Sequence, residues 1–125
     1  MAYAGNVALV TGAGSGMGRI AARRFADAGA QVAALDINEA ALADTSADRD
    51  NIHPLALDIT DFDAVAEAVR AFEAAHGPLD RVYNCAAIMP FGKLSEQEPA
   101  VTNRMMAINY GGLVNITRAT LPGMI

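Results

Sequence analysis

The stretch VALVTGAGSGMGRIAARRF, residues 7–25, decides the fold, because four glycines in it join a short apolar run to a helical pattern. Residues 7–10 are continuously apolar, as in a strand that is covered on both faces. From Gly16 onward, apolar side chains recur at helical spacing and predict one buried stripe, formed by Met17, Ile20, Ala21, Phe25 and Ala28. The stretch therefore predicts a strand, a glycine-rich loop and a helix.

The rest of the chain repeats this alternation. Apolar runs predict three more strands, at residues 31–35, 52–57 and 79–87. Periodic segments predict helices over residues 39–47, from residue 62 until Gly77-Pro78, and over residues 99–123. Strands that alternate with helices are typical of a parallel sheet with helices on both faces. We therefore expect residues 1–125 to form a single α/β domain.

Local signals mark where these helices begin and end. Gly29 stands where the first helix would be capped, and Asn38 suits the N-cap of the second. Two further start signals are predicted, a capping box of Thr60 with Asp63 and a pair formed by Ser95 and Glu98. In the last helix, Gly111-Gly112 weakens the middle by roughly 1 kcal/mol per glycine and permits a close crossing.

Composition argues against several classes of function. The formal net charge is −5 and no basic run is present, so we expect no nucleic-acid binding. No apolar run approaches the roughly 18 residues that span a bilayer, and residues 1–6 lack the basic region of a signal peptide. The single cysteine, Cys85, excludes an internal disulfide and agrees with a cytoplasmic protein. His53 and His76 have no further ligand at metal spacing, so no metal is expected.

The glycines of the loop have two interpretations. A loop between a strand and a helix lies at the helix N-terminus, where backbone N–H groups and the helix dipole attract anions. Gly12, Gly16 and Gly18 would let a pyrophosphate approach those groups, because glycine has no side chain to hold it away. The alternative is a purely structural turn, but the predicted strand before the loop and helix after it favour a dinucleotide site.

The order Thr11-Gly12-x-x-x-Gly16-x-Gly18 resembles the cofactor loop TGxxxGxG of the short-chain dehydrogenase/reductase family. The resemblance covers nearly the whole chain and implies a Rossmann-type doubly wound sheet of strand order 3-2-1-4. It also implies NAD(H) as cofactor, a small alcohol or ketone as substrate, and a homo-oligomer, dimer or tetramer. The cofactor contacts that it implies come from Thr11, Gly12, Ser15, Gly16, Met17, Gly18, Asp36, Ile37, Asp58, Ile59, Asn84 and Ala86.

Asp36 ends the second predicted strand and distinguishes between the two nicotinamide cofactors. A carboxylate there can accept hydrogen bonds from both hydroxyls of the adenosine ribose and would repel a 2′-phosphate. The residues that follow are Ile37-Asn38-Glu39, without a cation. The sequence therefore predicts a preference for NAD over NADP; the alternative for Asp36 is a solvated carboxylate at a strand end.

Two later segments also match the family. At Asp58-Ile59, the resemblance implies a hydrogen bond from the adenine amino group to Asp58 and support of the ring by the next N–H. Asp58 could also begin the cap of the following helix. The sequence Asn84-Cys85-Ala86-Ala87 stands where the family has Asn-Asn-Ala-Gly, so Cys85 and Ala87 depart from the pattern. We interpret Cys85 as a packed residue, because nothing adjacent would stabilise a thiolate.

Asn109 is the one catalytic position of the family that this chain contains. The resemblance implies that it interrupts the last helix and holds a water in a proton relay; the alternative is a hydrogen-bonded kink without chemistry. The family's Tyr-x-x-x-Lys pair is missing, because the residues four positions after Tyr3, Tyr83 and Tyr110 are not lysine. We therefore expect the cofactor half of a longer dehydrogenase, truncated before strand five and inactive alone. The second hypothesis is a non-catalytic module that binds NAD or docks to a partner.

Overall fold

The computed structural model describes residues 6–125; Tyr3 and the N-terminal segment discussed above lie outside the described residues. Its sheet has four parallel strands, β1 (Val7–Thr11), β2 (Gln31–Asp36), β3 (Ile52–Ala56) and β4 (Arg81–Tyr83). Their spatial order is β3-β2-β1-β4, so the predicted topology is confirmed. All four carboxyl ends therefore lie at one edge of the sheet, where ligands bind in open α/β folds.

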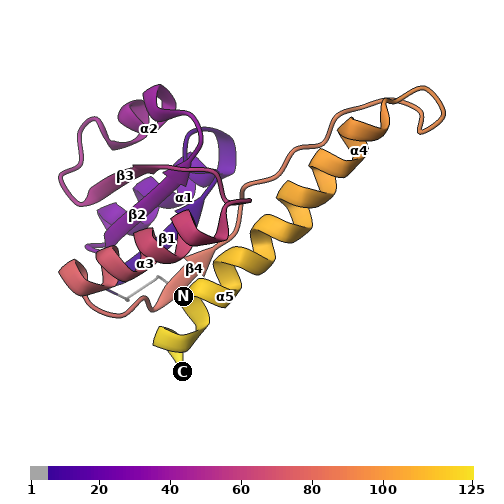
Figure 1. Ribbon diagram of the computed structural model, residues 1–125. Helices are drawn as coiled ribbons and strands as arrows, with labels where there is room; N and C mark the ends of the chain where they lie inside the picture. The colour runs from indigo at the N-terminus through magenta and orange to yellow at the C-terminus, as the bar shows by residue number, and fades with distance from the viewer. Residues whose placement is uncertain (1–5) are drawn as a thin grey trace.

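Two hydrophobic clusters cover the two faces of the sheet. Since successive side chains of a strand point to opposite faces, Leu9 joins one cluster and Val10 the other. The helices α1 (Gly16–Asp27) and α2 (Glu39–Ser46) pack on the Val10 face, and α3 (Phe62–His76) packs on the Leu9 face. Figure 1 shows these layers, with α3 in front of the strands and α1 behind them.

The buried stripe predicted for α1 is confirmed only in part, because Ala21 and Phe25 are partly buried against the core whereas the other three residues, Met17, Ile20 and Ala28, are exposed. Its buried residues are Gly18, Ala22 and Ala26, whereas the Met17 side chain is 67% exposed and that of Ile20 54%. The helix turns its smallest residues inward, because they let its backbone lie close to the strands. At Gly18 the fit is tightest, since an added Cβ would collide with the Gly12 carbonyl.

One predicted N-cap is confirmed and another is displaced by one residue. Asn38 caps α2, because its Oδ1 accepts a hydrogen bond from the Ala41 N–H at 3.0 Å. The N-cap of α3 is Asp61, which accepts from the Ala64 N–H at 3.1 Å, and not the predicted Thr60. The Thr60 hydroxyl instead donates to Asp58, so it is not available as a cap.

The strand β4 is shorter than the predicted residues 79–87. Only Arg81–Tyr83 pair with β1. Beyond them, the N–H groups of Cys85 and Ala86 both bond to the Thr11 side-chain hydroxyl, at 3.0 and 3.1 Å. The chain leaves the sheet at this point because a side chain at the end of β1 replaces the backbone ladder. The strand β3 likewise ends one residue early, at Ala56.

The C-terminal segment is one long helix in three parts, α4 (Pro99–Met106), a π-helical turn η1 (Ala107–Gly112) and α5 (Leu113–Met124). It begins at Pro99 after Glu98, while Ser95 lies in a separate turn, so the predicted Ser95 start is wrong. Pro99 suits the first helical position because it has no N–H to leave unpaired there. In Figure 1, α5 crosses the sheet beside α3, and α4 projects away from it.

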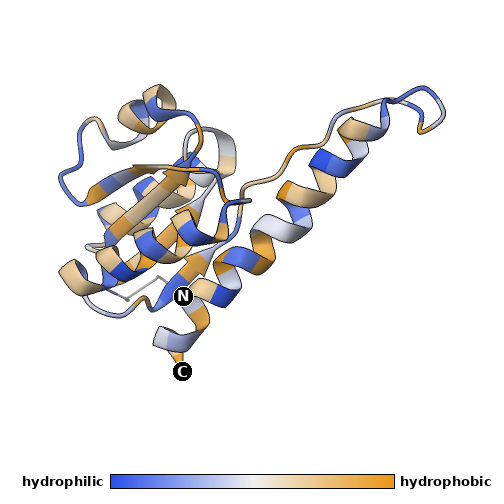
Figure 2. Ribbon diagram, viewed as in Figure 1, coloured by the Kyte–Doolittle hydropathy of each residue, from blue (hydrophilic) through white to orange (hydrophobic). Residues whose placement is uncertain are grey.

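Hydropathy follows the layers of the fold. In Figure 2 the strands are mainly hydrophobic, and the helices alternate between hydrophobic and hydrophilic residues. Gly112 is buried where α5 meets the loop after β3, and a Cβ there would collide with the Ile59 side chain. The close approach predicted for Gly111-Gly112 is thus made to a loop. Within residues 6–125, no helix is both long and apolar enough to cross a membrane.

Candidate functional site

A pocket of about 480 Å³ lies at the carboxyl ends of β1, β2 and β3. Its volume falls in the range typical of small-molecule sites, which is roughly 300–1,000 Å³. The loop before α1 lines the pocket together with the segments that follow β2, β3 and β4 and a face of α4 and η1. Among the predicted cofactor residues, it contains Gly12, Ser15, Gly16, Met17, Asp36, Ile37, Asp58, Ile59 and Ala86.

The glycine-rich loop presents an open helix N-terminus to this pocket. Gly12 and Gly16 adopt positive φ angles of 65° and 53°, which L-residues with side chains rarely adopt. Apart from its chain neighbours and the adjacent helix backbone, no described atom lies within 4 Å of the position that a Cβ would take at Gly16, so this position faces open space. Ser15, the N-cap of α1, makes no side-chain hydrogen bond to the first turn. This geometry fits an anion held by backbone N–H groups.

Gly14 is a site residue that the sequence did not single out. Its N–H donates to Asp36 Oδ2 at 2.9 Å, and a Cβ at Gly14 would approach that oxygen to 2.8 Å. The second oxygen, Oδ1, accepts from the Asn38 N–H at 3.0 Å. The Asp36 carboxylate is therefore fixed in orientation at the pocket wall, and each oxygen retains lone pairs for further acceptance.

Asp58 is a second carboxylate in the pocket lining. Its Oδ1 accepts hydrogen bonds from the Thr60 N–H at 2.9 Å and from the Thr60 hydroxyl at 2.7 Å. These bonds, and to a smaller extent the nearby Arg104 guanidinium, lower the pKa of Asp58 below its usual value. The side chain is therefore a carboxylate at neutral pH and can accept a hydrogen bond from an amino group.

Three predicted cofactor residues are not among the described residues that line the pocket. Thr11 is 1% exposed and ties the end of β1 to the segment after β4, as described above. Gly18 packs against the Gly12 carbonyl, and Asn84 is exposed where β4 has ended. Thr11 and Gly18 thus shape the loop, and the predicted contact of Asn84 with a cofactor stays a prediction.

Asn109 lies in the π-helical turn and holds the segment that follows β4. Its side-chain Oδ1 accepts from the Ile88 N–H at 2.9 Å, and its Nδ2 donates to the Ile88 carbonyl at 2.8 Å. The local interruption of the helix predicted at Asn109 is present, since residues 107–112 form the π turn. π-Helical turns often occur at functional sites. The predicted role of Asn109 in holding a water stays a prediction.

The pocket also contains residues that sequence reasoning missed. Arg104 and Ile108 line it from the C-terminal helix, four positions apart and hence on one face. Leu57, Cys85, Ala87 and Ile88 complete the lining. Helical spacing could have placed Arg104 and Ile108 together, but nothing local in the sequence indicates that this face turns toward the strand ends.

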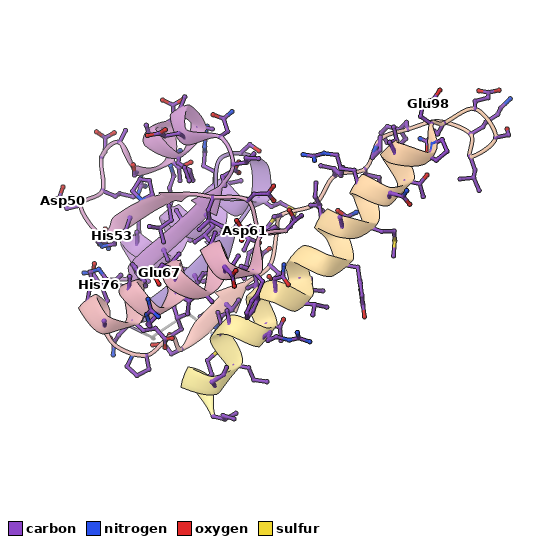
Figure 3. The ribbon with its side chains drawn as sticks, in the orientation of Figure 1. Asp50, His53, Asp61, Glu67, His76 and Glu98 are labelled. Carbon is purple, nitrogen blue, oxygen red and sulfur yellow. The ribbon has the colours of Figure 1, made fainter. Side chains whose placement is uncertain are left out.

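The two histidines lie together away from the pocket. Figure 3 shows His53 on β3 near His76 at the end of α3, and their ring centroids are 4.5 Å apart. His53 Nε2 lies 2.7 Å from the Gln31 side-chain oxygen, and burial followed by the His76 charge lowers the pKa of His53. Over residues 6–125, no group of three or more His, Cys, Asp or Glu side chains is arranged to hold a metal ion.

Comparison with protein-family models finds a match over residues 6–125 to the family described as short chain dehydrogenase. The chain is 40% identical over 121 residues to 2-keto-3-deoxy-L-fuconate dehydrogenase of Xanthomonas campestris pv. campestris, covering 97% of this chain and 39% of that protein. It is 38% identical over 125 residues to 2-dehydro-3-deoxy-L-rhamnonate dehydrogenase (NAD(+)) of a Sphingomonas species, covering 98% and 50%. The chain thus spans half or less of the length of these two relatives.

The chain also superposes on solved structures, again over only part of their length. The apo form of LigO from Sphingobium sp. strain SYK-6 superposes with a TM-score of 0.88 at 31% identity, covering 94% of this chain and 45% of that one. A metagenomic short-chain oxidoreductase in complex with NADP superposes with a TM-score of 0.87 at 30% identity, covering 99% and 58%.

Proposed function

Because the chain belongs to the short chain dehydrogenase family, we propose that its pocket binds NAD(H) as the cofactor part of an oxidoreductase that interconverts an alcohol and a carbonyl compound. The observation that carries this proposal is the position of the Asp36 carboxylate. It lies in the same pocket as the open N-terminus of α1, where Gly16 leaves free space. The helix N-terminus suits an anion, and the carboxylate beside it suits ribose hydroxyls.

The residues present fit such a cofactor. Backbone N–H groups at the start of α1 would hold the pyrophosphate, since Gly12 and Gly16 adopt the angles that a close backbone approach requires. Asp58 would accept a hydrogen bond from the adenine amino group, because its lowered pKa keeps it ionised. A nicotinamide cofactor supplies or accepts the hydride when it is bound.

The preference for NAD rests on Asp36 alone. Its carboxylate can accept from two ribose hydroxyls, while a 2′-phosphate would meet a like charge at short range. One relative carries NAD(+) in its name, but a similar structure contains NADP, so family membership does not decide between the cofactors. Arg104 is a cation of the pocket lining, and its charge acts on Asp58, which lies on a different strand end from Asp36.

Proton transfer to the substrate would require groups that this chain does not contain. Reduction of a ketone develops negative charge on oxygen, and general acid catalysis of such a step contributes typically 10²–10⁴-fold. No tyrosine of the sequence has a lysine four residues later, and the Asn109 amide does not titrate. We propose that the 125 residues alone bind cofactor without turnover, and that the protein carrying them acts in the cytoplasm as a homo-oligomer.

A fluorescence titration with NADH, followed by a turnover assay, tests this function. We expect saturable NADH binding by the purified chain and no oxidation of NADH with a panel of ketones. Failure to bind NADH would contradict the proposed site. The mass of the purified chain is confirmed before the assay. If that chain turns over NADH and the Tyr110→Phe variant does not, the proposed absence of catalytic groups is contradicted. Binding without turnover in the natural protein that carries this sequence would favour a non-catalytic NAD-binding module.

A further inference from the structure

Arg19 connects three elements directly behind the glycine-rich loop. Its Nη2 donates to the Gly14 carbonyl at 2.5 Å and to the Ala41 carbonyl at 3.1 Å. Its Nε donates to the Thr45 hydroxyl at 3.0 Å, and that fully buried hydroxyl lies 2.8 Å from the Ala13 carbonyl. A side chain of α1 thereby joins two consecutive carbonyls of the loop to α2, one of them through Thr45.

Both backbone polar groups of Gly14 are hydrogen-bonded to side chains. The Gly14 carbonyl accepts from Arg19, and the Gly14 N–H donates to Asp36 Oδ2 at 2.9 Å. Gly14 is buried, so its carbonyl would lose a strong partner if the guanidinium were removed. The planar guanidinium fixes direction as well as distance, because its donors have a rigid geometry.

We propose that Arg19 is a positioning residue for Asp36, acting through Gly14. The guanidinium sets the orientation of Gly14, and the Gly14 N–H holds Oδ2, so that the remaining lone pairs of the carboxylate face the ribose. This inference rests on the proposed function, in which Asp36 receives the ribose hydroxyls. Arg19 itself is not among the described residues that line the pocket, so it acts on cofactor choice without touching the cofactor.

Arg23 provides a matched control one helical turn along α1. Its Nε donates to the Thr45 carbonyl at 3.2 Å and its Nη2 to the Asp44 carbonyl at 2.9 Å. Arg23 thus joins α1 to α2 as Arg19 does, but its hydrogen bonds do not reach the loop. A purely structural role in helix packing would be shared by both arginines.

The test compares Arg19→Gln, Arg23→Gln and Arg19→Lys with the unmodified protein that carries this sequence. Two readouts are measured, the dissociation constants for NADH and NADPH and the amide hydrogen exchange rate of Gly14 without cofactor. For Arg19→Gln we expect at least tenfold weaker NADH binding, a smaller ratio of NADPH to NADH dissociation constants and faster Gly14 exchange. Arg23→Gln should leave all three within twofold, and Arg19→Lys should restore part of the loss.

Equal changes in Arg19→Gln and Arg23→Gln, or an unchanged cofactor ratio in Arg19→Gln, would overturn the inference. If Arg19→Gln does not fold, the comparison of Arg19→Lys with Arg23→Gln replaces it, with the same criteria. If the unmodified protein binds neither NADH nor NADPH, the proposed function fails. The Gly14 exchange rate then still decides whether Arg19 fixes the N–H that holds Asp36, and unchanged exchange in Arg19→Gln would overturn this inference as well.

Discussion

Asp36 at the end of β2 and Gly14 in the loop after β1 are joined by a hydrogen bond of 2.9 Å from the Gly14 N–H to the Asp36 carboxylate. The two central strands, β1 and β2, pair in parallel register, so the loop after β1 lies beside the end of β2. The bond brings the carboxylate to the same pocket wall as the open N-terminus of α1. The proposed selection of NAD depends on this arrangement.

Replacement of Asp36 by Asn should reduce the preference for NAD. The amide is nearly isosteric but has no charge to repel a 2′-phosphate, and one of its two acceptors becomes a donor. We expect NADH to bind about tenfold more weakly while NADPH binding holds or improves. Asp58→Asn is the matched control, since it removes a carboxylate from the same pocket and should weaken both cofactors alike. A ratio of dissociation constants that changes equally in the two variants would contradict the role of Asp36.

Gly16→Val should abolish measurable binding of NADH. The new side chain would enter the open space before α1 at a φ of 53°, where branched residues are strained. Gly29→Val is the control, because Gly29 also has a positive φ, of 97°, and no atom near its Cβ position, but it lies at the far end of α1. Both variants should lose stability, and calorimetry should show lost binding for Gly16→Val alone. Near-normal NADH affinity in Gly16→Val would remove the anion site from this loop.

Local signals in the sequence predicted the alternation of strands and helices, and the resemblance of the glycine loop to a known family predicted the strand order and most of the pocket residues. The glycine spacing and Asp36 stand at strand ends, and all parallel strands present those ends at one edge. Gly14 was missed because its role depends on a contact with Asp36, 22 residues away. Arg104 and Ile108 were missed for a similar reason, since only the path of the C-terminal helix brings them to the pocket.

Asn109→Ala should destabilise the fold by about 1–3 kcal/mol, because it removes two hydrogen bonds to Ile88 at roughly 0.5–1.5 kcal/mol each. Urea unfolding measures this change. Asn103→Ala is the control, because Asn103 lies at an exposed position of α4, in the same long C-terminal helix. It should change stability by less than about 0.5 kcal/mol. Equal stability of the two variants would mean that the bonds to Ile88 contribute nothing net.

The environment of His53, which packs against His76, should make the free energy of unfolding depend on pH below about 6.5. Partial burial, and secondly the charge of His76, lower the pKa of His53 in the folded state below the usual 6.5. As pH falls below about 6.5, the unfolded chain therefore takes up a proton more readily than the folded chain, and stability declines until the pH reaches the folded pKa. Stability should thus be higher at pH 7.5 than at pH 5.5.

His53→Phe should reduce this loss of stability on acidification. The variant keeps an aromatic ring against Phe72, whose centroid lies 5.6 Å from that of His53, but it cannot bind a proton. The free energy of unfolding is measured for each protein at pH 7.5 and at pH 5.5. The quantity compared is the decrease between these two pH values, because the substitution itself also changes the absolute stability. A loss as large in His53→Phe as in the unmodified protein would place the pH dependence elsewhere.

The errors in the buried face of α1 and in the N-cap of α3 have different physical causes. Periodicity identified large apolar residues, whereas the sheet requires close approach and selects Gly18, Ala22 and Ala26 for the inner face. Met17 and Ile20 remain outside, and Met17 lines the pocket. Thr60 fits a cap by its residue type, but its hydroxyl is engaged by Asp58 and the next residue becomes the cap. Packing against the sheet decided the first case, and a local hydrogen bond to a residue two positions earlier decided the second.

A calorimetric titration of NAD and NADP against the unmodified protein that carries this sequence tests the central claim most directly. The account predicts that NAD binds at least tenfold more tightly, a difference of about 1.4 kcal/mol or more. The expected cause of this difference is that both ribose hydroxyls of NAD donate to Asp36, whereas the 2′-phosphate of NADP cannot donate and is repelled. Equal or tighter binding of NADP would contradict the account, because it would mean that the Asp36 carboxylate does not face the adenosine ribose.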